Sequence, residues 1–426
     1  MSRRVTGNAG KMDEAAIHIL LSAFAVFPAC FCVRVDGSRG FAARARAGGP
    51  GWLPKVGSIQ CEGEPGSMQL MPIERIPDWE QRIARHDACW HGEIIDRPVV
   101  MMTLRRPNPE YPPPSPKSWP GLRDRWLDTE YQVAGKLAAV MNTEYLGDAL
   151  PHANPNLGPE VFSAFFGTEL EFGESTSWSI PNLHSWADVD KLRFDPNNFY
   201  WRKLDEMTDA FLEAGKGRFY TGLTDIHPGG DAIAAFRDPL ALNIDMIENK
   251  AAVMELLERV NQVCFYVYDY YFERLQQAGQ AICTWLNIVS SKRWYALSND
   301  FSCMISSAMF DEVFLPGIAA ECQHLEASIY HLDGPGALHH LDSLLSIPEL
   351  NAVQWVWGAG NGRASDWIHV FKKCQAAGKG LWIPLHISEL DRIMSELRPH
   401  GVWLQLSGVR NCDEAEAVLR EVAKWR

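Results

Sequence analysis

Short apolar runs alternate with longer amphipathic segments along most of the chain. Runs bounded by Gly, Pro or polar residues predict buried strands at 97–104, 161–172, 218–225, 281–288, 327–333, 351–358, 380–387 and 401–408. Apolar residues three and four apart predict helices at 127–142, 200–214, 250–277, 307–327, 336–344, 365–377, 388–397 and 413–424. Because strand and helix alternate strictly in the last third, we expect an α/β fold with a parallel sheet.

About eight strands close a (β/α)8 TIM barrel, which is the architecture that we expect. A doubly wound open sheet is the competing arrangement, but no GxGxxG sequence follows an early strand to favour it. The barrel is expected to carry extra N-terminal helices, beginning at 78–93, and a long loop at 105–121. In this loop prolines exclude regular pairing.

Residues 1–67 differ from the rest of the chain. An apolar run at 16–33 follows three basic residues, and an Arg/Gly/Ala-rich segment without periodicity comes next. Three interpretations stay open: a non-native extension with the true start near Met68 or Met71, a secretion signal or anchor, and a disordered tail. The expected domains are therefore a non-core extension at 1–67 and one barrel at 68–426.

Composition narrows the class of protein. The formal net charge of -13 argues against a nucleic-acid binder, which needs a basic face. The 10 cysteines form no CxxC pair, which is typical of a reducing compartment, so we expect a cytoplasmic protein that acts away from membranes. A homodimer stays open. Most of the 16 tryptophans are expected to pack in the core or at its rim, and some are candidates to line a cleft for rings or alkylated cations.

Polar residues end the predicted strands, where active sites of parallel barrels lie. Each could instead cap the helix that follows it. One further carboxylate, Asp300, falls at 295–306, in an expected loop over the same face. The strand-end residues are Asp225, His227, Trp285, Asn287, His331, Asp333, Gln354, His386 and Ser407.

The segments SIYHLDGPGALHHLDSLLSIPELNAVQWVWGAG and NDFSCMISSAMFDEVFLPGI resemble the uroporphyrinogen decarboxylase-like superfamily. The similarity is to bacterial members outside haem synthesis, related to corrinoid-dependent methyltransferases, and covers about residues 77–426. The resemblance implies a (β/α)8 barrel with its cleft at the strand C-termini. The decarboxylase itself uses arginines after the first strand and no cofactor, whereas the methyltransferases bind zinc through His-x-Cys and a later cysteine.

This chain has His331-Leu332-Asp333 where that branch has His-x-Cys. A carboxylate is a harder ligand than a thiolate, so the resemblance implies either weakly held zinc on His331 and Asp333 or a metal-free acid–base pair. A zinc site needs a third protein ligand, and the candidates are His227, His386 and Cys412.

We therefore expect a methyltransferase that demethylates a small methylated compound and passes the methyl group to a corrinoid on a partner protein. The expected catalytic residues are His331, Asp333 and Asp225. The expected substrate-binding residues are His227, Trp285, Asp300, Tyr330, Gln354 and His386. The alternatives are a cofactor-independent decarboxylase, a glycosidase that uses two carboxylates, and a non-catalytic binding barrel.

Overall fold

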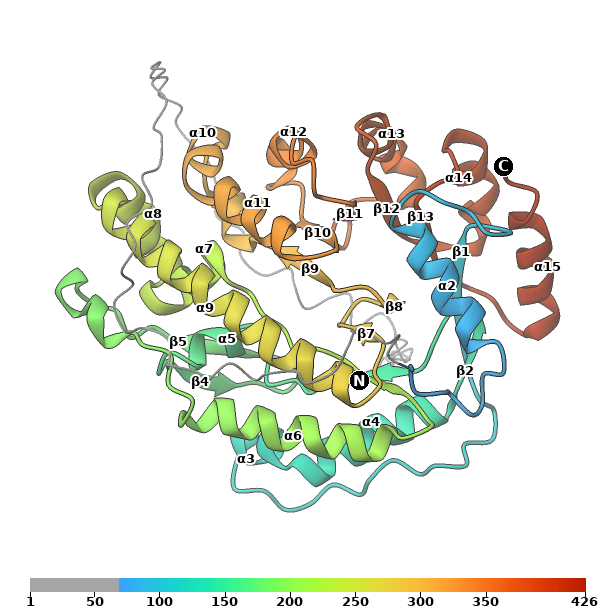
Figure 1. Ribbon diagram of the computed structural model, residues 1–426, viewed down its shortest axis with the longest axis horizontal. Helices are drawn as coiled ribbons and strands as arrows, with labels where there is room; N and C mark the ends of the chain where they lie inside the picture. The colour runs from blue at the N-terminus through green and yellow to red at the C-terminus, as the bar shows by residue number, and fades with distance from the viewer. Residues whose placement is uncertain (1–68) are drawn as a thin grey trace, which may run out of the picture.

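The computed structural model describes residues 69–426, and the extension expected at 1–67 lies outside them. The main sheet has seven strands in the order β2-β1-β13-β12-β11-β10-β9 (Figure 1). The strands are β1 (Val99–Arg105), β2 (Thr143–Gly147), β9 (Trp294–Ser298), β10 (Ala327–Asp333), β11 (Ala352–Val356), β12 (Gly380–His386) and β13 (Val402–Ser407). All pairings from β9 to β1 are parallel, and β2 runs antiparallel to β1. The expected α/β class is confirmed.

Three two-stranded pairs complete the described strands. They are β3 (His152–Ala153) with β6 (Tyr220–Thr221), β4 (Glu169–Phe172) with β5 (Ser177–Ile180), and β7 (Ile282–Cys283) with β8 (Val289–Ser290). Only the first pair is parallel. Leu223 N donates to Cys283 O at 2.8 Å, which places β6 beside β7. Among residues 69–426 these sheets do not join into one hydrogen-bonded ring, so closure of the barrel stays a prediction.

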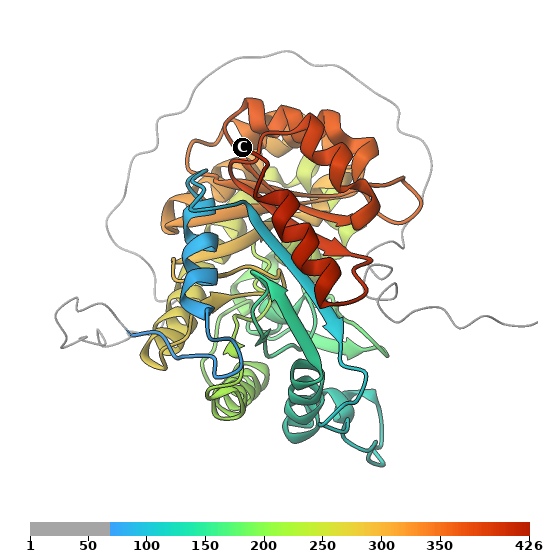
Figure 2. The same ribbon diagram turned by 90° about the vertical axis from the view of Figure 1, so that its right-hand side faces the viewer.

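Helices surround the strands (Figures 1 and 2). They are α2 (Trp79–Cys89), α3 (Leu122–Leu127), α4 (Thr129–Met141), α5 (Val161–Ala164), α6 (Phe199–Gly215), α7 (Gly229–Arg237), α8 (Pro239–Glu248), α9 (Lys250–Gln277), α10 (Ser307–Met309), α11 (Leu315–His324), α12 (Leu341–Leu345), α13 (Ile368–Ala376), α14 (Leu390–Glu396) and α15 (Cys412–Val422). In Figure 1, α10 to α15 form an arc around β9 to β13. Figure 2 shows α2 and α15 on either side of β1. None of the helices described between residues 69 and 426 has the length and apolar character needed to cross a bilayer.

The structure corrects two predicted segments. The strand predicted at 161–172 divides into helix α5 and the antiparallel strand β4, so it contributes nothing to the parallel sheet. Its buried apolar run is compatible with either structure, because periodicity does not separate a short buried helix from a strand. Conversely, part of the loop expected at 295–306 belongs to β9, at the edge of the main sheet.

Indole rings pack at the end of the sheet where the strands begin. The ring of Trp90 lies 5.2 Å from that of Trp294 and 4.7 Å from that of Trp403, and all three are buried. Trp403 Nε1 donates to His86 Nδ1 at 3.1 Å, so the indole donor is satisfied. These indole rings form part of the hydrophobic core at the end of the sheet where the strands begin.

Candidate active site

Polar side chains gather where the parallel strands end. His331 and Asp333 lie at the end of β10 and Gln354 lies in β11, while Asp225 and His227 follow β6. His331 pairs with Gln354 in the parallel register. Neighbours in a sheet project to the same face, so their side chains meet.

The ring of His331 is fixed by an amide and an indole. Its Nδ1 lies 2.7 Å from Gln354 Oε1. Because an amide oxygen only accepts, His331 donates through Nδ1, so that Nε2 is the ring nitrogen left to bind a proton or a metal ion. The ring of Trp285 meets it edge-on, with centroids 4.9 Å apart and planes at 88°. His331 is thus oriented as a base or a metal ligand.

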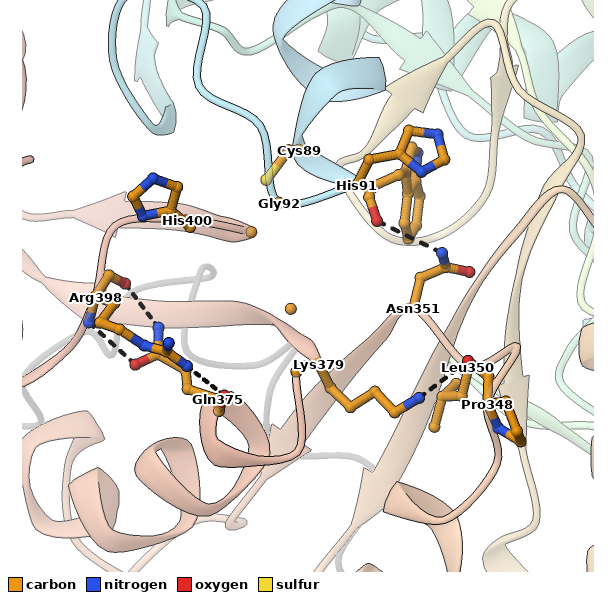
Figure 3. Close-up of a pocket in the computed structure, with 14 residues that line it drawn as sticks. Cys89, His91, Gly92, Pro348, Leu350, Asn351, Gln375, Lys379, Arg398 and His400 are labelled. Carbon is orange, nitrogen blue, oxygen red and sulfur yellow. Dashed lines mark hydrogen bonds between the residues drawn. The ribbon is translucent and has the colours of Figure 1, made fainter.

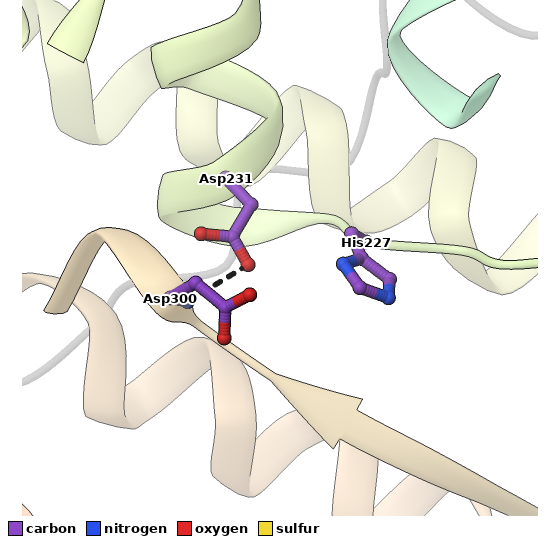
Figure 4. A group of neighbouring side chains, drawn as sticks. All are labelled: His227, Asp231 and Asp300. Carbon is purple, nitrogen blue, oxygen red and sulfur yellow. Dashed lines mark hydrogen bonds between the residues drawn. The ribbon is translucent and has the colours of Figure 1, made fainter. Parts of the chain in front are cut away.

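Three aspartates lie beside two histidines. One ligand atom each from His227, Asp231 and Asp300 lies within 4.8 Å of the others, as Figure 4 shows for their side chains. The same limit holds for Asp300, His331 and Asp333. Asp300 belongs to both sets, so we call these five residues the acid–imidazole group.

Asp231 positions Asp300 through the main chain. Its Oδ2 accepts from Asp300 N at 3.0 Å and from Ser298 Oγ at 3.3 Å, and its Oδ1 accepts from Phe301 N at 2.8 Å (Figure 4). These bonds join the first turn of α7 to the turn that follows β9. The backbone that carries Asp300 is therefore held at one place relative to His227.

Burial and mutual repulsion raise the pKa values of the three aspartates. The side chain of Asp300 is exposed, yet desolvation by the surrounding protein raises its pKa above the usual range, and the charges of Asp231 and Asp333 add to the rise. Burial also raises the pKa of Asp231, although the backbone N–H donors lower it. Burial raises the pKa of Asp333 as well, although the charge of His331 lowers it. A group of this kind retains a proton to higher pH than usual or accepts a cation.

Asp225 and His227 each have a buried atom without a hydrogen-bond partner, namely Oδ1 and Nε2. Burial raises the pKa of Asp225 and lowers the pKa of His227, and their attraction opposes both shifts. Leaving a buried polar atom unpaired costs about 1–3 kcal/mol. A ligand that bonds to these atoms recovers that free energy.

A cavity of about 690 Å³ lies in front of these side chains. Among the predicted residues, those lining it are Asp225, His227, Trp285, His331, Gln354 and His386. Trp382 lines the cavity with Trp285, and the buried Nε1 donors of both rings have no hydrogen-bond partner. The volume suits a small-molecule site with apolar walls and few polar groups.

A smaller cavity of about 260 Å³ adjoins the first. His227, Asp231 and Asp300 are among its lining residues, and His227 lines both cavities. The acid–imidazole group therefore has open space on two sides, so a substrate and a second small molecule can approach it separately.

Three predicted site residues differ from expectation. Tyr330 is 1% exposed and lines neither cavity, because it precedes His331 and successive strand residues face opposite sides. It is a core residue and not a cleft wall. Asp333 also lines neither cavity and acts only within the acid–imidazole group. His386 lines the larger cavity, but its Nδ1 accepts from Ser388 N at 3.2 Å and so caps the turn before α14.

The residue that the structure places beside both His331 and Asp333, with one possible ligand atom from each within 4.8 Å of the others, is Asp300. It was not among the candidates His227, His386 and Cys412. Cys412 starts α15 and lines a separate cavity, with its Sγ 3.7 Å from Glu144 Oε2. The donor set of one imidazole and two carboxylates fits a divalent cation, and the Gln354 contact behind His331 is the kind of support that ligating histidines have.

Sequence reasoning missed Asp231. The residue lies in the first turn of α7, four positions after His227, within HPGGDAIAAF. The only signal was an acidic residue after two glycines, in a segment for which no helix was predicted.

The likeness of this chain to known proteins lies in its fold. No family model and no curated protein matches the chain. Among solved structures, the fold is similar to that of a methyltransferase from Methanosarcina mazei, with 10% sequence identity and a TM-score of 0.52. The alignment covers 80% of this chain and 98% of that chain. At this identity the likeness concerns the fold: the chain shares the architecture of a methyltransferase.

Proposed function

We propose that the protein is a methyltransferase that demethylates a small methylated compound and passes the methyl group to a corrinoid carried by a separate protein. The observation that carries the proposal is the acid–imidazole group beside an indole-lined cavity. A methyl group that leaves oxygen or nitrogen as a cation equivalent leaves its bonding electrons on that atom. The leaving atom then needs a proton or a Lewis acid, and this group offers both.

Asp300 is the proposed proton donor. Its raised pKa keeps the carboxyl protonated to higher pH, and Asp231 holds its backbone in place. As the carbon–heteroatom bond breaks, the proton moves from Asp300 to the leaving atom, and the Asp300 carboxylate is reprotonated from solvent. Trp285 and Gln354 position His331 against the substrate, and the unpaired atoms of Asp225 and His227 bind its polar groups.

The partner's corrinoid supplies the cobalt nucleophile that accepts the methyl group. In the alternative without proton transfer, Asp300, His331 and Asp333 would hold a divalent cation, which would supply a Lewis acid for the leaving atom. The resemblance implies zinc, whereas the two carboxylates favour a harder ion.

Metal analysis separates these two forms of the mechanism. If the cation is used, purified protein contains about one divalent ion per chain, which a chelator removes and which both His331→Ala and Asp333→Asn lose. His386→Ala, which lies outside the group, retains the ion. If the purified wild-type protein contains no ion and both His331→Ala and Asp300→Asn lose activity, the proton-donor form is correct.

The activity test uses methoxy and methylammonium compounds as donors and free cob(I)alamin as acceptor, without oxygen. We expect one methylated corrinoid per demethylated donor, followed by absorbance and mass spectrometry. Asp300→Asn should lower kcat about 100-fold, the usual size of a general-acid effect. The matched control is Asp342→Asn, on the exposed α12, where the carboxylate pairs with Lys373. Full activity of Asp300→Asn, or no transfer from any donor, contradicts the proposal.

A further inference from the structure

We infer that the protein has a second binding site, for a small anion with phosphate or carboxylate groups, at the end of the sheet opposite the candidate active site. The site is a cavity of about 400 Å³ (Figure 3). It is formed by the end of α2 and by the segments that lead into β11, β12 and β13. This inference is independent of the proposed function.

Lys379 is the first observation. It is 8% exposed, and it is the only buried lysine or arginine between residues 69 and 426. Its Nζ donates to Ile347 O at 2.6 Å and to Pro348 O at 3.2 Å, and Figure 3 draws the bond to Pro348. No carboxylate of the described residues forms an ion pair with it, although the charge of the exposed Glu349 acts on it from farther away. A buried ammonium group without a counter-ion is costly, and a bound anion would supply one.

The charge around the cavity is the second observation. Arg398, His91 and His400 line it with Lys379, and its lining contains no aspartate or glutamate. This is unusual in a chain with 53 acidic and 40 basic residues. Arg398 donates to Gln375 O and likewise has no ion-pair partner among the described residues. The charges of Lys379 and Arg398 beside a concave surface with low-dielectric walls attract anions, and the imidazoles of His91 and His400 can donate hydrogen bonds to them.

Backbone geometry keeps the cavity open. At Gly401, φ is 69°, a conformation that favours glycine, and Gly401 packs against Gly380. A Cβ on Gly380 would lie 2.7 Å from Gly401 O. Gly92 and Gly378 also line the cavity, so four of its lining residues carry no side chain. The opening suits a ligand that contacts backbone as well as the cationic groups.

The alternative explanation is that Lys379 only ties down the loop at 347–348. Titration of the full-length protein with inorganic phosphate and with citrate, by calorimetry at constant ionic strength in chloride, tests this. We expect a Kd of about 1 mM or tighter for at least one anion. Lys379→Met should weaken binding at least 10-fold, and Arg398→Gln should weaken it in the same direction.

The matched control is Lys372→Met, on the same helix-to-strand segment, whose exposed ammonium pairs with Glu396 and which should bind like the wild type. Absence of binding to both anions in the wild type overturns the inference, as does an unchanged Kd in a folded Lys379→Met protein. If circular dichroism shows that Lys379→Met is unfolded, Arg398→Gln decides, and an unchanged Kd in that variant overturns the inference.

Discussion

At the scale of single residues, Glu321 makes the protein sensitive to pH. It lies in α11, 6% exposed, and burial raises its pKa to about 8, with Asp231 raising it further. The native state therefore binds more protons than the unfolded state between an ordinary glutamate pKa of 4.5 and pH 8. Since a folded-state pKa above the unfolded one makes stability fall as pH rises, this carboxyl destabilises the fold across that window.

Glu321→Gln should remove this penalty. At pH 8 the variant should gain on the order of 3 kcal/mol in unfolding free energy, and at pH 4 almost nothing. Urea denaturation at pH 8 and at pH 4 measures the change in unfolding free energy. Glu248→Gln, at the exposed end of α8, should leave the pH dependence unchanged. Parallel pH profiles for Glu321→Gln and wild type would show that the buried glutamate is not the cause.

Individual site residues were predictable where strand periodicity was clear. His331 and Gln354 end neighbouring strands with the period of two, and the structure brings them to 2.7 Å. Tyr330 was predicted to bind substrate, although the same period of two places it on the opposite face of the strand from His331. Asp231 was out of reach, because its role depends on bonds to residues about 70 positions away.

At the scale of elements, β6 and β7 meet at a glycine. A Cβ on Gly222 would lie 2.7 Å from Cys283 O and 3.0 Å from its Sγ, so the two segments approach only without a side chain there. Gly222→Ala should therefore destabilise the protein by about 1–3 kcal/mol through overpacking.

Denaturant unfolding measures this change, and Gly135→Ala in α4 is its control. At Gly135 a Cβ meets only Pro114 Cγ at 3.9 Å, an ordinary contact, and alanine favours a helix interior. That control should be neutral or stabilise by about 0.5–1 kcal/mol. Equal loss of stability in both variants would refute the close approach at Gly222.

Elements with a long, regular pattern were predicted best. Helix α9 has the bounds that periodicity gave, 250–277, because one apolar stripe continues through all its turns. Short elements were not predicted. Strand β9 has five residues, all buried, and its apolar sequence does not distinguish a strand from a loop. Helix α7 begins with two glycines and helix α8 with a proline, and these residues obscured the helical spacing of the apolar residues that follow.

At the scale of the whole molecule, residues 69–426 contain two hydrophobic core clusters of their own. The large core cluster joins residues from Cys89 to Trp425, and its smaller neighbour starts at Ile73. Deleting residues 1–67 should therefore change the melting temperature by no more than about 2 °C. Calorimetry of the truncated and full-length proteins measures this, and a fall of about 10 °C would assign the extension to the folded unit.

The parallel direction of the main sheet has a consequence for how the protein can change. Each of β10, β11 and β12 presents its last residues to the acid–imidazole group or its cavity, while the segments before β11, β12 and β13 form the cationic cavity. A library of variants confined to the loops after the strands therefore leaves the loops before the strands unchanged. Directed evolution can alter donor preference at one end while the opposite end is inherited unchanged.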